Sequence, residues 1–164
     1  MCTNAISIFE NINVKGVVKF HECYDSGETI VTFDLHGMQP NKMLACHIHE
    51  YGDESDGCKS LGSHWNPKNN NHGYTCLSIG KNKPKKCFIN ESHAGDLLNN
   101  IKSDRNGKFT YVYTDSRLRL SGDISESIVG RSVVIHSGID DLGLGGDAES
   151  LKTGNAGGRM ACAI

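Results

Sequence analysis

The sequence predicts an all-β fold, an antiparallel sandwich or barrel, and three observations support this. Apolar and polar residues alternate with a period of two in several short runs, as on strands whose two faces meet different surroundings. Turn signals such as Asn106-Gly107 and Ser121-Gly122-Asp123 lie between possible strands. Nineteen glycines against three prolines indicate many tight turns and leave little room for long helices. Short strands with frequent turns are typical of antiparallel sheets.

The predicted strands follow one another along the chain. Ile6 and Ile8 alternate with Ser7 in the first, and residues 31–35 alternate in the same way. Residues 44–49 form a strand that ends in two histidines, and residues 109–114 form a later, aromatic-rich strand.

Two long segments, residues 52–92 and 140–158, lack strand character. Loops of that length are uncommon in compact domains unless they are functional or disordered. We find no linker, domain boundary or internal repeat, and therefore predict a single domain over residues 1–164.

Composition excludes several functions. The net charge of −2 does not suggest a nucleic-acid partner. No stretch approaches the ~20 apolar residues that span a membrane, and the N-terminus lacks the basic and apolar regions of a secretory signal. We therefore expect a cytoplasmic protein whose cysteines mostly remain thiols. Seven cysteines without a C-x-x-C pair fit a zinc finger poorly.

His47 and His49 flank Ile48 on a predicted strand. Residues i and i+2 of a strand point to the same face, so both imidazoles can reach one metal ion. The alternative is a pair of surface histidines on an edge strand.

A second group is carried by the loops. Histidines and an aspartate in this density suit zinc, which favours four tetrahedral ligands, although each residue alone reads as a solvated loop side chain. Two four-coordinate metals need eight ligand positions, and six histidines with one aspartate supply seven if none is shared. One histidine that binds through both ring nitrogens would complete the set. These residues are His47, His49, His64, His72, His93, Asp96 and His136.

The chain resembles the copper/zinc superoxide dismutases over nearly its whole length. The matching motifs are HIHEYGD at residues 47–53, Gly57-Cys58, GSHWNP at 62–67, His72-Gly73, HAGDL at 93–97, SGD at 121–123, VIH at 134–136, DDLG at 140–143 and KTGNAGGRMAC at 152–162.

The resemblance implies a Greek-key, eight-stranded β-sandwich or barrel with two long functional loops. It implies copper bound by His47, His49, His64 and His136. It implies zinc bound by His64, His72, His93 and Asp96, with His64 between the metals. Asp140 matches a carboxylate that orients one histidine of each site.

The implied activity is conversion of superoxide to dioxygen and hydrogen peroxide, with His64 and Arg159 as catalytic residues. Arg159 matches an arginine that holds the anion beside the copper. Glu149, Lys152 and Thr153 match residues that guide superoxide to the site.

The resemblance also implies a Cys58–Cys162 disulfide and a homodimer, and leaves a copper chaperone as a possible further partner. The chain stops at Ile164, earlier than is usual, which makes the dimer less secure. The stretch before His93 is longer than usual; it reads as a surface insertion, with a Cys76–Cys87 disulfide as the alternative.

Two other departures bear on the site. Leu98 stands where glycine is usual, which questions the backbone after Asp96, and Leu144 replaces a common lysine, which predicts weaker steering.

Two rival functions can be compared with the enzyme. A copper-delivery or copper-buffering domain on the same scaffold would typically lack copper ligands or the arginine, and this chain has both. A zinc-dependent nucleic-acid binder does not fit the charge or the ligand spacing.

Overall fold

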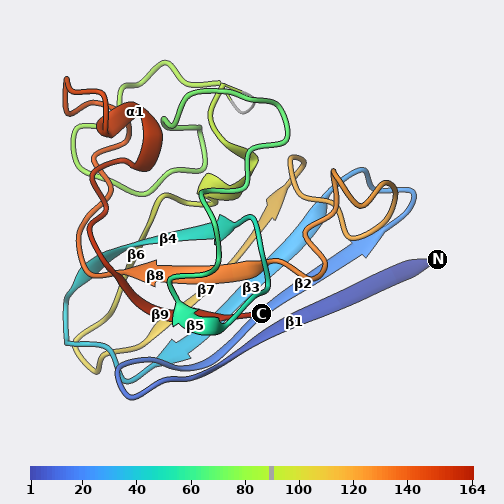
Figure 1. Ribbon diagram of the computed structural model, residues 1–164, viewed down its shortest axis with the longest axis horizontal. Coiled ribbons are helices and arrows are strands. Elements are labelled where there is room, and N and C mark those ends of the chain that lie inside the picture. The colour runs from blue at the N-terminus through green and yellow to red at the C-terminus, as the bar shows by residue number, and fades with distance from the viewer. Residues whose placement is uncertain (89–90) are drawn as a thin grey trace.

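The computed structural model describes residues 1–88 and 91–164, and it contains two four-stranded antiparallel sheets (Figure 1). The first sheet has the order β1 (Cys2–Glu10), β2 (Lys15–Cys23), β3 (Thr29–His36) and β7 (Phe109–Asp115). The second has the order β6 (Asn100–Lys102), β4 (Met43–His49), β8 (Ser132–His136) and β9 (Arg159–Ala163). The predicted all-β fold is confirmed as two sheets with eight strands, and neither order closes into a barrel over the described residues.

The core lies between the two sheets. Phe33 of β3 packs against Phe109 and Tyr113 of β7, with ring centroids 5.4 Å and 6.4 Å away. Ile48 of β4 and Ile135 of β8 are buried in the same cluster. Because strand residues alternate between faces, the neighbours of Ile48 and Ile135 point away from this core, which places histidines on the outer face of the second sheet.

The second long loop and most of the first gather at one end of the sandwich, whereas β5 (Ser55–Cys58) of the first loop lies beside β9 (Figure 1). The first loop carries β5 and η1 (Ala94–Asp96), so the prediction that it lacks strand character is wrong at β5. This loop also includes residues 89–90, which lie outside the description. The second loop carries a single turn of helix, α1 (Ser150–Thr153). None of the helices described is long and apolar enough to cross a bilayer.

Disulfides join three cysteine pairs, so the expectation that most cysteines are thiols is wrong. The pairs are Cys2–Cys23, Cys58–Cys162 and Cys76–Cys87. Cys46, the free cysteine, is buried in the core. Cys76–Cys87 closes the insertion on itself, and Cys58–Cys162 fixes β5 of the first loop to the last strand.

Candidate metal centre

His47 and His49 occupy alternate positions on β4, where they pair with Val134 and Ser132 of β8. Both side chains lie on the face opposite the core residue Ile48. His136 ends β8 at an irregularity in the pairing between β8 and β9. The shared face of His47 and His49 agrees with the i, i+2 spacing, and the neighbouring strand β8 adds His136 to them.

Ring nitrogens from the histidines of this first group converge. Nε2 of His49 lies 3.2 Å from Nε2 of His136. Their other nitrogens are engaged, because Nδ1 of His49 lies 2.9 Å from the Gly62 carbonyl oxygen and Nδ1 of His136 lies 3.2 Å from that of Gly157. One potential ligand atom from each of His47, His49, His64 and His136 lies within 4.8 Å of all the others.

A second group forms around Asp96, at the end of η1. Its Oδ1 lies 3.2 Å from Nδ1 of His64, 2.9 Å from Nδ1 of His72 and 3.3 Å from Nδ1 of His93. These four residues also place ligand atoms within 4.8 Å of one another, and all are buried. Three imidazoles and a carboxylate form a donor set of the kind that binds zinc.

His64 belongs to both groups. Its Nδ1 faces Asp96, whereas Nε2 is buried and has no hydrogen-bond partner among the described residues. The rings of His47 and His64 have centroids only 4.0 Å apart, and Nδ1 of His47 is similarly buried and unpaired within the described chain. One ring thus presents a nitrogen to each group, as the ligand count required.

Asp140 contacts one histidine of each group, at the ring nitrogen that points away from the metal group. One carboxylate oxygen accepts from Nε2 of His47 at 2.7 Å and the other from Nε2 of His72 at 2.9 Å. Asn99 Nδ2 donates to the same carboxylate at 3.0 Å, and the Leu142 backbone N–H donates at 2.7 Å. These hydrogen bonds turn the opposite nitrogens of both rings toward the metal groups.

Electrostatics keep the first group neutral. Burial lowers the pKa of His47 to about 3 and that of His136 to about 4, so both rings retain a free lone pair at neutral pH. Burial also lowers the pKa of His72, but the carboxylates of Asp96 and Asp140 outweigh it and raise the pKa to about 10. The space between these carboxylates therefore favours a cation.

The residues fit copper and zinc. Buried polar atoms normally have partners, so the unpaired Nδ1 of His47 and Nε2 of His64 call for a ligand between them. An all-imidazole donor set suits copper, and the mixed set around Asp96 suits zinc.

The zinc-type group rests on a loop that is held from several sides. The Gly95 backbone N–H donates to the Trp65 carbonyl at 3.0 Å. A side chain at Gly95 would collide with the carbonyl oxygens of Ile48 and Trp65, so this close approach requires glycine. The residues with positive φ here are Leu97 at 48° and Asn99 at 60°. Leu98 itself is a buried core residue, so its side chain is accommodated.

Arg117 is a positioning residue that the sequence did not reveal. Its guanidinium donates to the carbonyl of His93 at 3.2 Å and to that of Leu97 at 2.9 Å. Asp115 accepts two further hydrogen bonds from it, at 2.9 Å and 2.7 Å. An arginine two residues after an aspartate is common on protein surfaces, so the sequence gives no sign that Asp115 and Arg117 are buried. The packing of the folded chain shows it.

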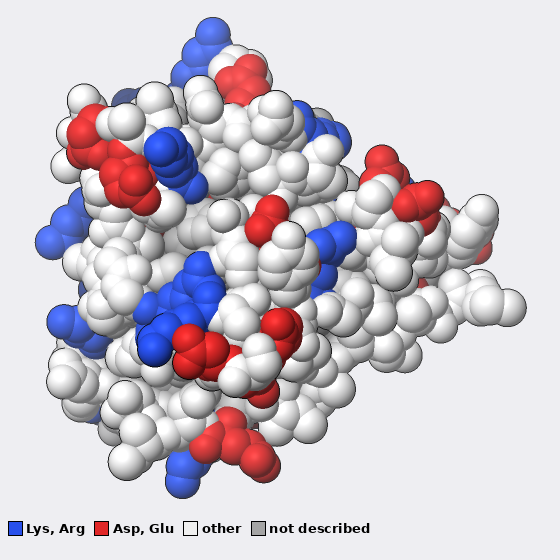
Figure 2. Space-filling view, viewed as in Figure 1, with Lys and Arg blue, Asp and Glu red and all other residues white. Residues whose placement is uncertain are grey.

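A cavity of about 800 Å³ opens onto the first histidine group. His49, His64, His136 and Arg159 line it, together with Glu149, Lys152 and Thr153 from the second loop. Figure 2 shows basic side chains close to a hollow below the position of α1, with acidic side chains next to them. The structure therefore brings the predicted guiding residues to the cavity that reaches the histidines.

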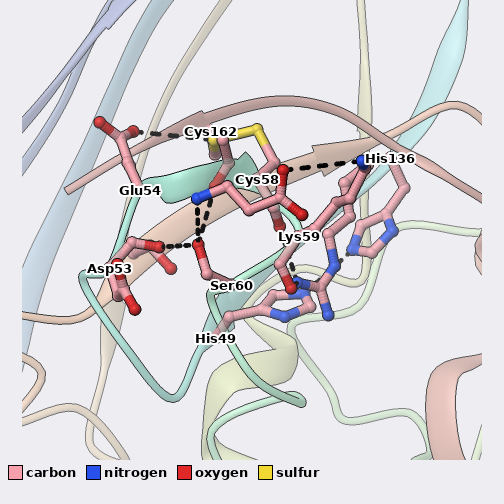
Figure 3. Close-up of a disulfide and its surroundings, with 12 residues drawn as sticks. His49, Asp53, Glu54, Cys58, Lys59, Ser60, His136 and Cys162 are labelled. Carbon is pink, nitrogen blue, oxygen red and sulfur yellow. Dashed lines mark hydrogen bonds and ion pairs between the residues drawn. A yellow bond between two sulfur atoms is a disulfide. The ribbon is translucent and has the colours of Figure 1, made fainter.

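Arg159 is fixed by the loop that carries the Cys58–Cys162 disulfide. It donates to the carbonyls of Cys58 at 2.7 Å and Lys59 at 3.2 Å, and also to that of Gly62. In register, Arg159 of β9 pairs with His136 of β8. Figure 3 shows the Cys58–Cys162 disulfide with His49 and His136 in its surroundings.

Comparison with known proteins agrees with this geometry. The sequence model of the copper/zinc superoxide dismutase (SODC) family matches residues 14–164. The chain belongs to this family. A copper/zinc superoxide dismutase of Yarrowia lipolytica is 48% identical over 151 residues, which cover 92% of this chain and 88% of the relative.

Other members of the superoxide dismutase family are similar at comparable levels. One from Paramecium bursaria Chlorella virus 1 is 43% identical over 98% of this chain and 76% of its own. Among solved structures, the crystal structure of the clock protein EA4 has a TM-score of 0.82 at 35% identity, covering 98% of this chain and 92% of that one.

Proposed function

We propose that this protein is an active copper/zinc superoxide dismutase. The observation that carries the proposal is the single ring of His64, which offers one nitrogen to an all-histidine group and the other to a group with Asp96. In this proposal His47, His49, His64 and His136 hold copper. His64, His72, His93 and Asp96 hold zinc.

Bound copper would supply reversible one-electron chemistry, and zinc would stabilise the loop that shapes the site. The overall reaction takes two superoxide anions and two protons to dioxygen and hydrogen peroxide. Superoxide is the substrate implied by membership of the family.

Arg159 binds and orients the anion. Its half-buried guanidinium borders the cavity and is held by three carbonyl oxygens. Because the side chain is already ordered, little further conformational entropy is lost when superoxide binds. Lys152 adds positive charge at the opening of the cavity. Glu149 lowers the positive potential there, and its carboxylate accepts from Thr153 Oγ1 at 3.0 Å.

His64 moves a proton. Its Nε2 faces the first group and has no partner among the described residues, so while that atom is not bound to copper it can carry a proton to the peroxide product. Its Nδ1 faces Asp96 within the second group, so a zinc ion held by that group would keep the ring in place.

We also propose a homodimer. Tyr51, Val129 and Ile164 expose between 46% and 57% of their surface near the end of β9. Gly52, next to Tyr51, lies against both Ile164 and Gly130, which follows Val129, so these three side chains border one apolar patch. A second copy would bury that patch. A copper chaperone and a cytoplasmic location stay predictions.

The test combines elemental analysis with a superoxide assay on protein purified without added metal and on protein loaded with copper and zinc. We expect activity to rise with copper content. Copper fully bound without activity would instead support a copper-buffering protein.

The His64→Gln variant sharpens this test. It should lose activity at equal copper content because it removes the shared ring. His36→Gln is the matched control, since His36 is exposed on the first sheet, away from both groups.

A further inference from the structure

A third group of metal-type ligands lies on the first sheet, at the end of the β1–β2 hairpin. It contains Cys2, His21 and Cys23, whose ligand atoms lie within 4.8 Å of one another. In the structure Cys2 and Cys23 are joined as a disulfide, and the Cys23 sulfur lies 3.2 Å from Nε2 of His21.

Strand register places these side chains together. Cys2 is directly opposite Cys23 and Asn4 is directly opposite His21. The Tyr24 backbone N–H donates to the Met1 carbonyl at 3.1 Å, which makes Cys2 and Cys23 a non-hydrogen-bonded pair with Cα atoms 4.1 Å apart. Because His21 and Cys23 are two residues apart, both point to the outer face of the sheet.

Asn4 fixes the orientation of His21. Its Oδ1 lies 2.7 Å from Nδ1 of the ring, so Nδ1 carries the hydrogen and Nε2 presents its lone pair toward the sulfur atoms. Metal-binding histidines usually have such a partner on the second nitrogen. An isolated cystine would need neither the oriented imidazole nor the asparagine.

We propose that Cys2, His21 and Cys23 form a redox-controlled zinc site, and that the structure shows its oxidised form. A dithiol reductant would convert the disulfide to two thiols and itself become a disulfide. Binding of Zn²⁺ would then release two protons as two thiolates form. Oxidation by hydrogen peroxide would reverse this: Zn²⁺ leaves, the sulfur atoms bond, and two added protons complete two molecules of water.

The site is separate from the two-metal centre. Its residues belong to β1 and β2 of the first sheet, whereas the other histidine groups belong to the second sheet and the long loops. Figure 1 shows the N-terminal end of β1 on the opposite side of the molecule from α1. Two sulfur donors and one imidazole also differ from the nitrogen and oxygen donors of that centre, and they favour a soft ion, Zn²⁺ or Cu⁺.

The test uses the copper- and zinc-loaded full chain, treated with a phosphine reductant under anaerobic conditions. Alkylation followed by mass spectrometry reports whether Cys2 and Cys23 are thiols. Equilibrium dialysis against Zn²⁺, with metal analysis, measures further zinc binding. Dialysis against Co²⁺ adds a spectroscopic readout, because thiolate ligands give a charge-transfer absorption that nitrogen and oxygen ligands do not.

We expect one further zinc ion in the reduced protein and none in the oxidised protein. Cys2→Ser/Cys23→Ser should abolish this binding and the thiolate absorption, and Asn4→Ala should weaken the binding by roughly tenfold or more. Cys76→Ser/Cys87→Ser is the matched control and should bind the ion normally.

Three results would overturn the proposal. The first is a Cys2–Cys23 bond that resists the reductant, and the second is unchanged zinc binding in Cys2→Ser/Cys23→Ser. The third is further metal binding without the thiolate absorption in the Co²⁺ protein, which would place the ion on nitrogen or oxygen ligands elsewhere.

Discussion

Asp140 and His72 form a buried pair in which a carboxylate oxygen lies 2.9 Å from Nε2 of the ring. The other oxygen of Asp140 holds His47 in the neighbouring group. One side chain therefore orients a ligand in each metal group. The two groups should respond together to any change at this position.

Asp140→Asn is expected to weaken zinc binding by about 10–100-fold. An amide cannot accept from both imidazoles with oxygen atoms, so at least one ring loses its orientation. Competition with a chelator of known affinity measures the effect. Asp25→Asn, in an exposed turn, is the control, and equal zinc affinity in both variants would contradict the role assigned to Asp140.

Arg117→Ala should destabilise the protein by about 3–5 kcal/mol, because it leaves the Asp115 carboxylate buried without its partner. It also frees the carbonyls of His93 and Leu97, so zinc affinity should fall more than copper affinity. Urea unfolding and metal competition measure the two effects. Arg105→Ala is the control for loss of one positive charge, because Arg105 is exposed. Equal loss of both metals would show that Arg117 supports the fold in general.

The strand-borne part of the candidate site could be predicted from local pattern, whereas the two ligand sets and the roles of Asp140 and Arg159 came from the family resemblance. Alternation on a strand predicts that His47 and His49 share a face, whatever the rest of the fold. The Cys2–Cys23 pair escaped prediction because it depends on which strands become neighbours, and Arg117 because its burial depends on how the loop around His93 and Leu97 packs against the end of β7. The strand β2 also gave little signal, since it carries Gly16 and buries the charged Glu22.

Glu22 links stability to pH. The residue is buried, and burial alone raises its pKa, but hydrogen bonds from Leu120, Ser121 and Arg119 lower the net pKa below the ordinary value. Folding therefore favours the ionised form. Its contribution is fully present above the unfolded-state pKa, about 4.3, and is lost as the pH falls through the lower folded-state pKa.

Glu22→Gln should accordingly reduce the free energy of unfolding by about 1–3 kcal/mol at pH 7. The difference from the wild type should shrink as the pH falls below the unfolded-state pKa. Urea unfolding of the metal-free proteins across this range provides the measurement, with Glu10→Gln on the exposed end of β1 as the control. A difference that stays constant with pH would rule out the ionised carboxylate as its source.

The Cys58–Cys162 disulfide closes a loop with a sequence separation of 104. Cys58→Ser/Cys162→Ser should cost about 4–5 kcal/mol of unfolding free energy in the chain-entropy account. Cys76→Ser/Cys87→Ser, with a separation of 11, should cost less, roughly 3 kcal/mol. Urea unfolding of metal-free protein without reductant compares them. The reverse order would mean that native contacts outweigh loop closure.

Arg159→Ala is expected to keep both metals and to lower the rate with superoxide by about tenfold or more at low ionic strength. Among the described residues the Arg159 guanidinium donates to the carbonyls of Cys58, Lys59 and Gly62 and to no histidine, so its removal takes away no metal ligand. Added salt screens attraction over distances beyond about 10 Å, so the wild-type rate should fall with salt more steeply than the variant's.

Arg159→Lys separates attraction from orientation. Lysine retains the charge but lacks the planar fork that holds three carbonyls and an anion together, so the salt dependence should return while the maximal rate recovers only in part. Stopped-flow rates at several ionic strengths, with metal contents measured on the same samples, provide both readouts. If Arg159→Lys recovered the full rate, Arg159 would act through its charge alone. If Arg159→Ala had the wild-type rate, Arg159 would have no role in the reaction.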